Sequence, residues 1–192
     1  MNASQRRTRF IRRLTMKCLV ALSAVGIAGM LPGMSVQAYE PMAPWQVAQS
    51  SLYSSSLGRF EIAFPASPDI TIEEDDIEGE PIEIHIFESS TSNIGQYMVA
   101  YSDLPANVLS QGPDVVLDNL RDSFEDIDPA VLKAIEVDVQ LGGHPGRRYR
   151  FDHTEGTIDI RLYLVNERTY MLLAVDDNET DVDRFISSFA LM

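Results

Sequence analysis

Apolar residues recur at every second position along most of the chain after residue 57, a pattern typical of β-strands with one buried face. A turn at 75–81 joins two of these runs, so Ile82, Ile84 and Ile86 are expected opposite Ile70 and Ile72. The strands predicted in this way are 60–64, 70–72, 82–86, 97–101, 135–141, 158–164 and 169–175. The last four strands of the chain are expected to form an antiparallel meander.

Two segments have the helical period of about 3.6 residues instead. The first is 112–127, where Pro113 and Asp114 open a helix. The second is 179–191, where Thr180 is expected to cap the helix. The apolar positions on one face are Val116, Leu117, Leu120 and Phe124 in the first helix and Val182, Phe185, Ile186 and Phe189 in the second. Together the elements predict an α+β fold with helices flanking a central antiparallel β-sheet.

The first 38 residues have the pattern of a secretory signal peptide. Six basic residues precede an apolar run of about 14 residues, shorter than the roughly 20 that a membrane-spanning helix needs. Cleavage is expected after Ala38, and an uncleaved anchor is the alternative. Arginine pairs at 6–7 and 12–13 leave twin-arginine export open beside the general route. The protein is therefore expected in the periplasm, the thylakoid lumen or the extracellular space.

Residues 39–56 are rich in proline and serine and have no period, which predicts a flexible lead before one domain at 57–192. The only tryptophan, Trp45, lies in this lead and is a candidate partner contact. The only cysteine, Cys18, would leave with the signal peptide. A mature chain without cysteine can form no disulfide, zinc–cysteine site or thiol-based active site.

The charge balance is strongly acidic. The chain has 15 Lys and Arg against 29 Asp and Glu, a formal net charge of −14. Removal of the signal peptide would leave nine basic residues against the same 29 acidic ones, a net charge of −20. Such a field repels nucleic acid and anionic lipid, so neither is an expected partner. The acidic excess is explained either by solubility in an exported compartment or by attraction to cations or to a basic protein surface.

The stretch 138–151, DVQLGGHPGRRYRF, places a glycine-rich turn before three arginines. Glycine supplies the positive φ and proline the fixed φ of a tight connection, so a hairpin corner is predicted. Arg148 and Arg150 would share one face of the second strand, with Glu136, Asp138 or Asp159 as cross-strand partners. The candidate contacts for an anion or an acidic partner at this corner are His144, Arg147, Arg148 and Arg150.

The order of these motifs resembles the PsbP-like proteins, which are extrinsic lumenal proteins related to an oxygen-evolving subunit of photosystem II. The matching stretches are GRFEIAFP, YMVAYSDLP, VQLGGHPGRRYRF, RLYLVNERTYMLLAV and DRFISSF, and the resemblance covers 57–192. It implies an α/β/α sandwich around a central antiparallel sheet and association with a membrane protein complex. The matching positions are mostly glycine, proline and apolar residues, so no metal or partner residue is carried over.

Motifs of the common hydrolases, zinc proteases and phosphate-binding loops do not occur in the sequence. Asp152 and His153 are adjacent, but neighbours on a strand point to opposite faces and would not orient one another. Carboxylates cluster around the turn at 75–81 and before the last helix. The candidate calcium ligands are Asp176, Asp177, Glu179 and Asp181, although their segment lacks the glycine and final glutamate of an EF-hand loop.

Two functions from different classes fit these patterns. The first is an exported, non-enzymatic binding or assembly module that associates with a membrane protein complex. The alternative is a small exported ligand-binding protein or hydrolase-like enzyme with a pocket between sheet and helix. His85 or His153 would be the polar group of such a pocket. No cofactor other than calcium is indicated.

Overall fold

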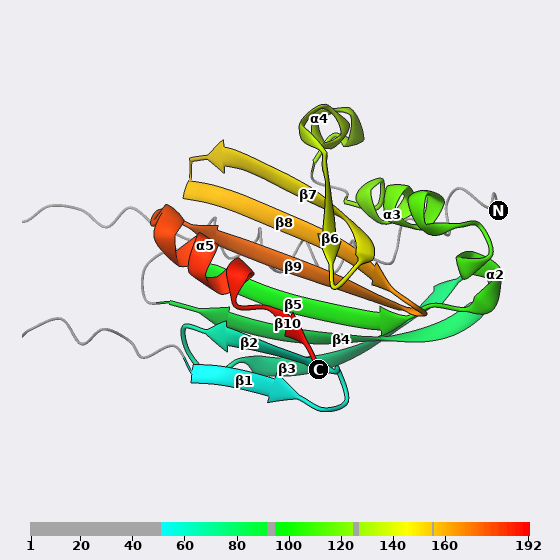
Figure 1. The fold of residues 1–192 in the computed structure, drawn as a ribbon, viewed down its shortest axis with the longest axis horizontal. Helices are drawn as coiled ribbons and strands as arrows, with labels where there is room; N and C mark the ends of the chain where they lie inside the picture. The colour runs from blue at the N-terminus through cyan, green and yellow to red at the C-terminus, as the bar shows by residue number, and fades with distance from the viewer. Residues whose placement is uncertain (1–50, 92–94, 125–126, 155) are drawn as a thin grey trace, which may run out of the picture.

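A seven-stranded antiparallel sheet lies at the centre of the molecule (Figure 1). The structure is a computed structural model that describes residues 51–91, 95–124, 127–154 and 156–192. The strands of the sheet are β3 (Asp69–Ile77), β4 (Glu80–Ser90), β5 (Gln96–Asp103), β6 (Val137–Leu141), β7 (His144–His153), β8 (Gly156–Val165) and β9 (Arg168–Asp176). Their spatial order is β3-β4-β5-β9-β8-β7-β6. The predicted meander is confirmed, because β6 to β9 are neighbours in chain order.

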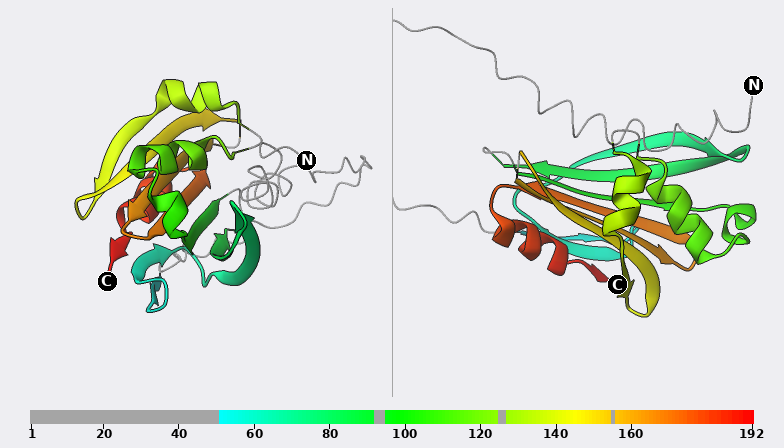
Figure 2. Two further views of the ribbon diagram at one scale, coloured as in Figure 1. Left: turned by 90° about the vertical axis from the view of Figure 1, so that its right-hand side faces the viewer. Right: turned by 90° about the horizontal axis from the view of Figure 1, so that it is seen from above.

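Three helices pack against one face of this sheet: α2 (Ala106–Leu109), α3 (Pro113–Arg121) and α4 (Pro129–Ile135) (Figure 2). Their buried side chains share one core cluster with alternate residues of the strands. The helical members of the cluster are Val108, Val116, Leu117 and Leu132, and the strand members include Ile82, Ile84, Ile86, Met98, Tyr149, Ile160 and Leu162. The period of two along each strand places these side chains on the same face.

The opposite face is covered by a three-stranded sheet and a helix. The small sheet consists of β1 (Ser51–Ser55), β2 (Phe60–Phe64) and β10 (Ala190–Leu191), and the helix is α5 (Glu179–Ser187). Aromatic rings dominate this second core, where the Phe60 ring lies 5.3 Å from Phe87 and 5.6 Å from Phe189. The antiparallel sheets and few helices agree with the predicted α+β class. An α/β/α sandwich is not confirmed, since one outer layer contains strands as well as a helix.

The register of the β3–β4 hairpin differs from the expected one. Its turn consists of residues 78–79 alone, both with positive φ, which is the geometry of a two-residue type I′ turn. This register pairs Ile70 with Phe87 and Ile72 with His85, so the isoleucines of β4 point to the other face. A shift of one residue moves a side chain across the sheet. Ile70 and Ile72 are consequently 55% and 56% exposed.

The helix predicted for 112–127 is wrong in its extent, because α3 ends at Arg121. A further helix, α4, begins at Pro129, and the Asp128 side chain accepts a hydrogen bond from the Ala130 amide at 2.9 Å. This helix includes Ile135, which was expected to begin a strand. An N-cap aspartate followed by proline is a strong helix start, and it prevails over the alternation of Ile135 with the valines that follow.

The last helix also differs at both ends. The Asn178 side chain, not Thr180, caps α5 and accepts a hydrogen bond from the Thr180 amide at 3.1 Å. The helix ends at Ser187, and the residues expected to continue it include the short strand β10. β10 pairs with β2, which ties the end of the chain into the small sheet.

The lead was expected to extend to residue 56, but residues 51–55 form β1 and pair with β2. Serine-rich composition hid this strand, because only Leu52 and Tyr53 among its residues are apolar or aromatic. The expected signal peptide and Trp45 lie outside the described residues. In the part of the chain that the structure describes, the helices are all too short and too polar to cross a membrane.

Candidate functional site

The arginine corner, by which we mean Arg147, Arg148 and Arg150, follows a tight hairpin between β6 and β7, as predicted. Leu141 pairs with His144 across a turn of residues 142–143 only. Both glycines of the turn have positive φ, 59° and 87°, which favours glycine over residues with a β-carbon. Hence the segment HPG already belongs to β7.

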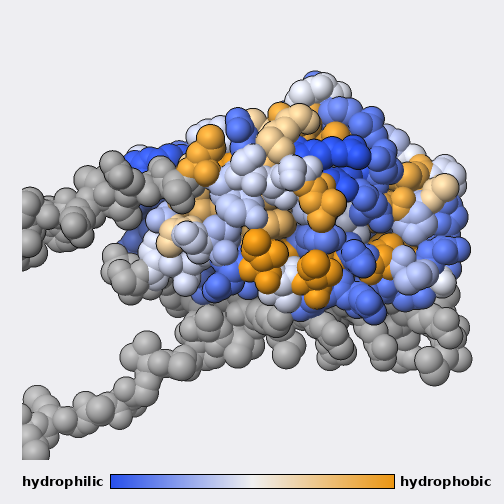
Figure 3. Space-filling model, turned by 90° about the horizontal axis from the view of Figure 1, so that it is seen from below, coloured by the Kyte–Doolittle hydropathy of each residue, from blue (hydrophilic) through white to orange (hydrophobic). Residues whose placement is uncertain are grey.

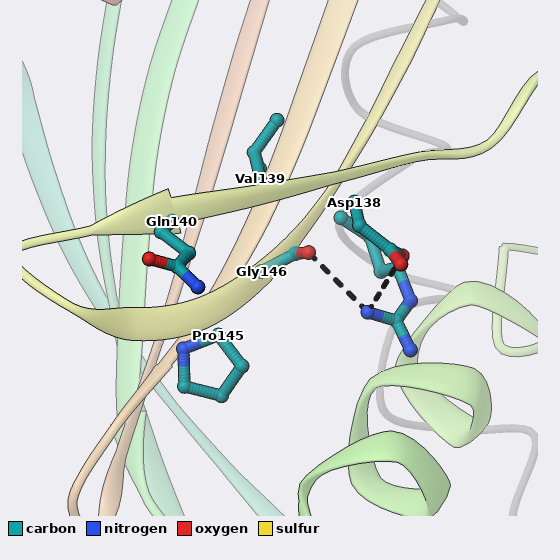
Figure 4. Close-up of a pocket in the computed structure, with 6 residues that line it drawn as sticks. Asp138, Val139, Gln140, Pro145 and Gly146 are labelled. Carbon is teal, nitrogen blue, oxygen red and sulfur yellow. Dashed lines mark hydrogen bonds and ion pairs between the residues drawn. The ribbon is translucent and has the colours of Figure 1, made fainter.

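The β6–β7 hairpin borders a hollow of about 360 Å³ (Figure 4). The hollow is lined by Asp138, Val139, Gln140, Pro145, Gly146 and Arg147. The Arg147 guanidinium lies 2.7 Å from Asp114 Oδ1 of α3 and 3.0 Å from Asp138 Oδ1 of β6. Its Nε is 3.6 Å from Glu136 Oε1, beyond hydrogen-bond distance, and has no hydrogen-bond partner among the described residues.

Glu136 connects this hollow to two helices. Its carboxylate accepts hydrogen bonds from Arg121 at 3.0 Å, Lys133 at 2.6 Å and the Tyr149 hydroxyl at 2.9 Å. Burial alone would raise the pKa of Glu136, but the hydrogen bonds from Lys133, Tyr149 and Arg121 outweigh burial and lower the pKa to about 2. Burial and the same carboxylate raise the pKa of the Tyr149 hydroxyl. The network fixes the ends of α3 and α4 against β7.

The other two arginines of the corner contact a buried carboxylate on the neighbouring strand. Asp159 of β8 is fully buried and accepts hydrogen bonds from Arg148 at 3.1 Å, Arg150 at 3.3 Å and Arg161 at 3.2 Å. The predicted pairing of Arg148 and Arg150 with Asp159 is thus confirmed. Pairing with Glu136 or Asp138 is not, because these residues share a face with Arg147 and bind it instead.

Arg150 also reaches the last helix. It donates hydrogen bonds to Glu179 and Asp183 of α5. All three arginines of the corner therefore contact carboxylates of the chain itself. An anion that bound here would have to displace one of these carboxylates, so the arginines primarily hold β6, β7, β8 and α5 together.

The candidate calcium ligands contact protein donors. Asp176 accepts hydrogen bonds from the Tyr97 hydroxyl and the Asn178 amide, and Asp181 binds Arg184 at 2.6 Å. Glu179 binds Arg150, while a hydrogen bond to Asp176 raises the pKa of the exposed Asp177. Within the described ranges, no three His, Cys, Asp or Glu side chains are arranged to hold a metal ion. Calcium binding at these residues stays a prediction.

The three histidines are far from one another in the sheet. The His85 ring stacks on Tyr101 at 4.6 Å, and its Nε2 lies 3.5 Å from a Glu83 carboxylate oxygen. His144 directly follows the β6–β7 turn, and His153 ends β7, where its Nδ1 is 3.3 Å from the Thr154 hydroxyl. None of these contacts unites a histidine with a nucleophile and an orienting carboxylate.

Sequence patterns did not indicate the outer edge of β3 as a candidate site, because Ile70 and Ile72 were expected opposite the isoleucines at 82–86. The signal that could have found it is the Glu-Gly pair at 78–79. Two-residue turns with glycine at the second position fix the register of a hairpin, and here that register turns both isoleucines away from the first core cluster.

Comparisons with known proteins found likeness in fold only. No family model and no curated protein matches the chain. The solution structure of cyanobacterial PsbP from Synechocystis is similar, with 13% sequence identity and a TM-score of 0.48, over 85% of this chain and 98% of that one. A crystal structure from Bacteroides thetaiotaomicron has 13% identity and a TM-score of 0.39, over 75% of this chain and 49% of that one.

Replacing Asp159 with Asn should strongly destabilise the fold. The change removes the negative charge that three guanidinium groups share, and breaking a buried ion pair from one side costs about 3–5 kcal/mol. Chemical unfolding at pH 7 measures the loss. The matched control is Asp152→Asn. Asp152 is exposed, and among the described residues its carboxylate accepts a hydrogen bond only from the Thr157 hydroxyl. Equal stability of the two variants would contradict the structural role of the corner.

The free energy of unfolding should fall in acid because of Glu136. Its folded-state pKa of about 2 lies below the unfolded value of 4.5, so its contribution is present above pH 4.5 and is lost as the pH falls through 2. The difference corresponds to about 3 kcal/mol. Glu136→Gln should therefore have a lower free energy of unfolding than the wild type at pH 7. This difference in free energy of unfolding should shrink as the pH falls from 4.5 to 2. A stability difference that stays constant over this pH range would contradict the lowered pKa of Glu136.

Proposed function

We propose that this protein is an exported, non-enzymatic binding module that associates with another protein of a membrane complex. The observation that carries the proposal is the exposed apolar edge of the central sheet. Ile70 and Ile72 lie on the same face of β3, and both are more than half exposed. Seen from the side of β1 and β3, apolar groups lie among strongly hydrophilic ones (Figure 3). Apolar residues on a strand whose outer edge is unpaired favour pairing with another chain.

The β6 edge at the other end of the sheet is protected. β6 has only five residues, and its Asp138 is held by Arg147 at 3.0 Å. Val137 is its one large exposed apolar side chain, at 53%. A very short edge strand is one of the means by which a sheet avoids pairing with another chain. We therefore assign the partner to β3, which has nine residues and two isoleucines that are more than half exposed.

The export and membrane-complex parts of the proposal are supported by the sequence. A basic and apolar segment with small residues before position 39 is typical of a signal peptide. The resemblance to PsbP-like proteins implies an extrinsic protein that associates with a membrane protein complex. A strongly acidic surface suits attachment to a basic protein surface rather than to anionic lipid.

A second candidate function is binding of a small ligand in the hollow beside Arg147. Its volume of about 360 Å³ lies within the range of about 300–1,000 Å³ typical of ligand sites. The Arg147 guanidinium lines the hollow, and its terminal nitrogens contact Asp114 and Asp138. Because Asp114 and Asp138 flank the same guanidinium, the hollow favours a ligand that carries a donor or cation beside its acceptor.

Co-migration with a membrane complex tests the first function. The mature chain, residues 39–192, should co-migrate in size-exclusion chromatography with a complex solubilised from membranes of its host. Replacing Ile70 and Ile72 with Thr keeps two β-branched residues in the strand but removes apolar contact area, and should weaken association at least about tenfold. The matched control is Val115→Thr with Val137→Thr, two exposed valines away from β3.

Co-migration that is equal for both double variants would contradict the role of β3. Absence of any co-migrating complex, together with thermal stabilisation by a small zwitterionic compound that Arg147→Lys abolishes, would favour the ligand-binding alternative. The role of the lead is best examined by deleting residues 39–50, because a longer deletion would remove β1.

A further inference from the structure

The free edge of β3 carries apolar and acidic residues in a fixed order. Directly opposed residues of neighbouring strands share a face, and Ile70, Ile72, Glu74 and Asp76 alternate with residues that face the first core. All four side chains are exposed. The strand therefore presents, on one face, two isoleucines followed by two carboxylates. We call these four residues the β3 edge.

The acidic half of the β3 edge faces further negative charge. Glu74 pairs directly with Glu83 of β4, and like charges in that position destabilise a sheet. No lysine or arginine occurs between Arg59 and Arg121, whereas 13 aspartates and glutamates do. In the described chain, no ion pair joins Glu74 or Asp76 to a lysine or arginine. A cation placed beside Glu74 and Glu83 would offset this repulsion.

The backbone of β3 is available for pairing along its first half. β3 pairs with β4 on one side, and no other strand of the described residues pairs with its outer side. Alternate residues of such a strand direct their N–H and C=O groups away from the sheet. Close to the turn, the Asp76 amide donates to Asp75 Oδ1 at 2.8 Å, and Asp76 Oδ1 accepts from the Gly79 amide at 3.0 Å. The open stretch is thus Asp69 to Glu74.

We propose that the β3 edge binds an extended segment of a partner protein as an added antiparallel strand. The segment has two basic residues at alternate positions followed by two apolar ones. In the antiparallel direction its apolar side chains lie opposite Ile72 and Ile70 and its second basic side chain lies opposite Glu74. Its first basic side chain extends beyond the paired stretch, beside the Asp76 carboxylate. Main-chain hydrogen bonds supply affinity and the alternate side chains supply specificity. The inference rests on the proposed binding function and names the chemistry of the partner.

A second copy of this chain is a poor occupant of the same edge. Two β3 strands paired in parallel would oppose carboxylate to carboxylate, and two paired antiparallel would oppose isoleucine to carboxylate. Each copy also carries a formal net charge of −14, or of −20 once the expected signal peptide is removed. Repulsion between two such copies opposes their association. Charge complementarity therefore favours a basic segment over self-association.

Two synthetic peptides test the proposal in solution. The probe is acetyl-Lys-Thr-Lys-Thr-Val-Thr-Val-amide, and its matched control replaces both lysines with glutamates. Titration of the isotope-labelled mature protein at low ionic strength should move the backbone amide signals of residues 69–74 with the basic peptide only. Glu74→Gln with Asp76→Asn should weaken binding about 3- to 10-fold, as expected for two exposed ion pairs. Glu167→Gln with Asp152→Asn makes the same change in net charge away from β3 and should leave binding unchanged.

Several results would overturn the inference: equal binding of the acidic peptide, signal changes centred on β6, concentration-dependent dimerisation through β3, or no binding of the basic peptide at millimolar concentration. Its failure is distinguishable from failure of the proposed function. If the membrane complex still co-migrates with the Glu74→Gln and Asp76→Asn variant but not with the Ile70→Thr and Ile72→Thr variant, the module binds a partner, but that partner is not a basic strand.

Discussion

The burial of β9 on both of its faces is the constraint on which the other layers depend. β9 is the middle strand of seven, and each of its residues except Leu173 is buried. Such a strand requires apolar cover on two sides. The helices α2, α3 and α4 supply one cover, and the small sheet with α5 supplies the other. With both faces covered, the backbone of this sheet can pair with another chain only at its two outer strands, and β3 is the longer of the two, with nine residues against five in β6.

The few basic residues of the described chain are distributed to serve this architecture. Arg148, Arg150 and Arg161 surround the buried Asp159, while Arg121 and Arg147 contact Glu136. Guanidinium groups that bind several carboxylates at once fix strands and helices relative to one another. The acidic excess then remains on the β3–β4 hairpin, where no basic residue is near in sequence. The same distribution stabilises the fold and gives one end of the sheet a strongly negative surface.

Much of the fold could be predicted from the sequence, because alternation and glycine turns act locally. The β6–β7 hairpin followed from the double glycine, and the shared face of Arg148 and Arg150 followed from alternation. Alternation left Glu136, Asp138 and Asp159 open as their partners, and the structure shows Asp159. The exposure of Ile70 and Ile72 could not be predicted from alternation alone, since the register of one turn decides which face they occupy. β1 was missed because its stability comes from pairing with β2 and not from its own serine-rich composition. Likewise, alternation after Ile135 concealed α4, whose burial of Leu132 is a tertiary effect.

Amide hydrogen exchange of the isolated complex tests the central claim most directly. The exchange rate of each peptide of the central sheet should be compared between the protein alone and the protein bound to the complex with which it co-migrates. Docking on the β3 edge predicts slowed exchange in a peptide spanning 69–74 and no change in β6, since pairing would engage only the outward amides of β3. Slowed exchange at β6 and α4 with an unchanged 69–74 segment would contradict the account.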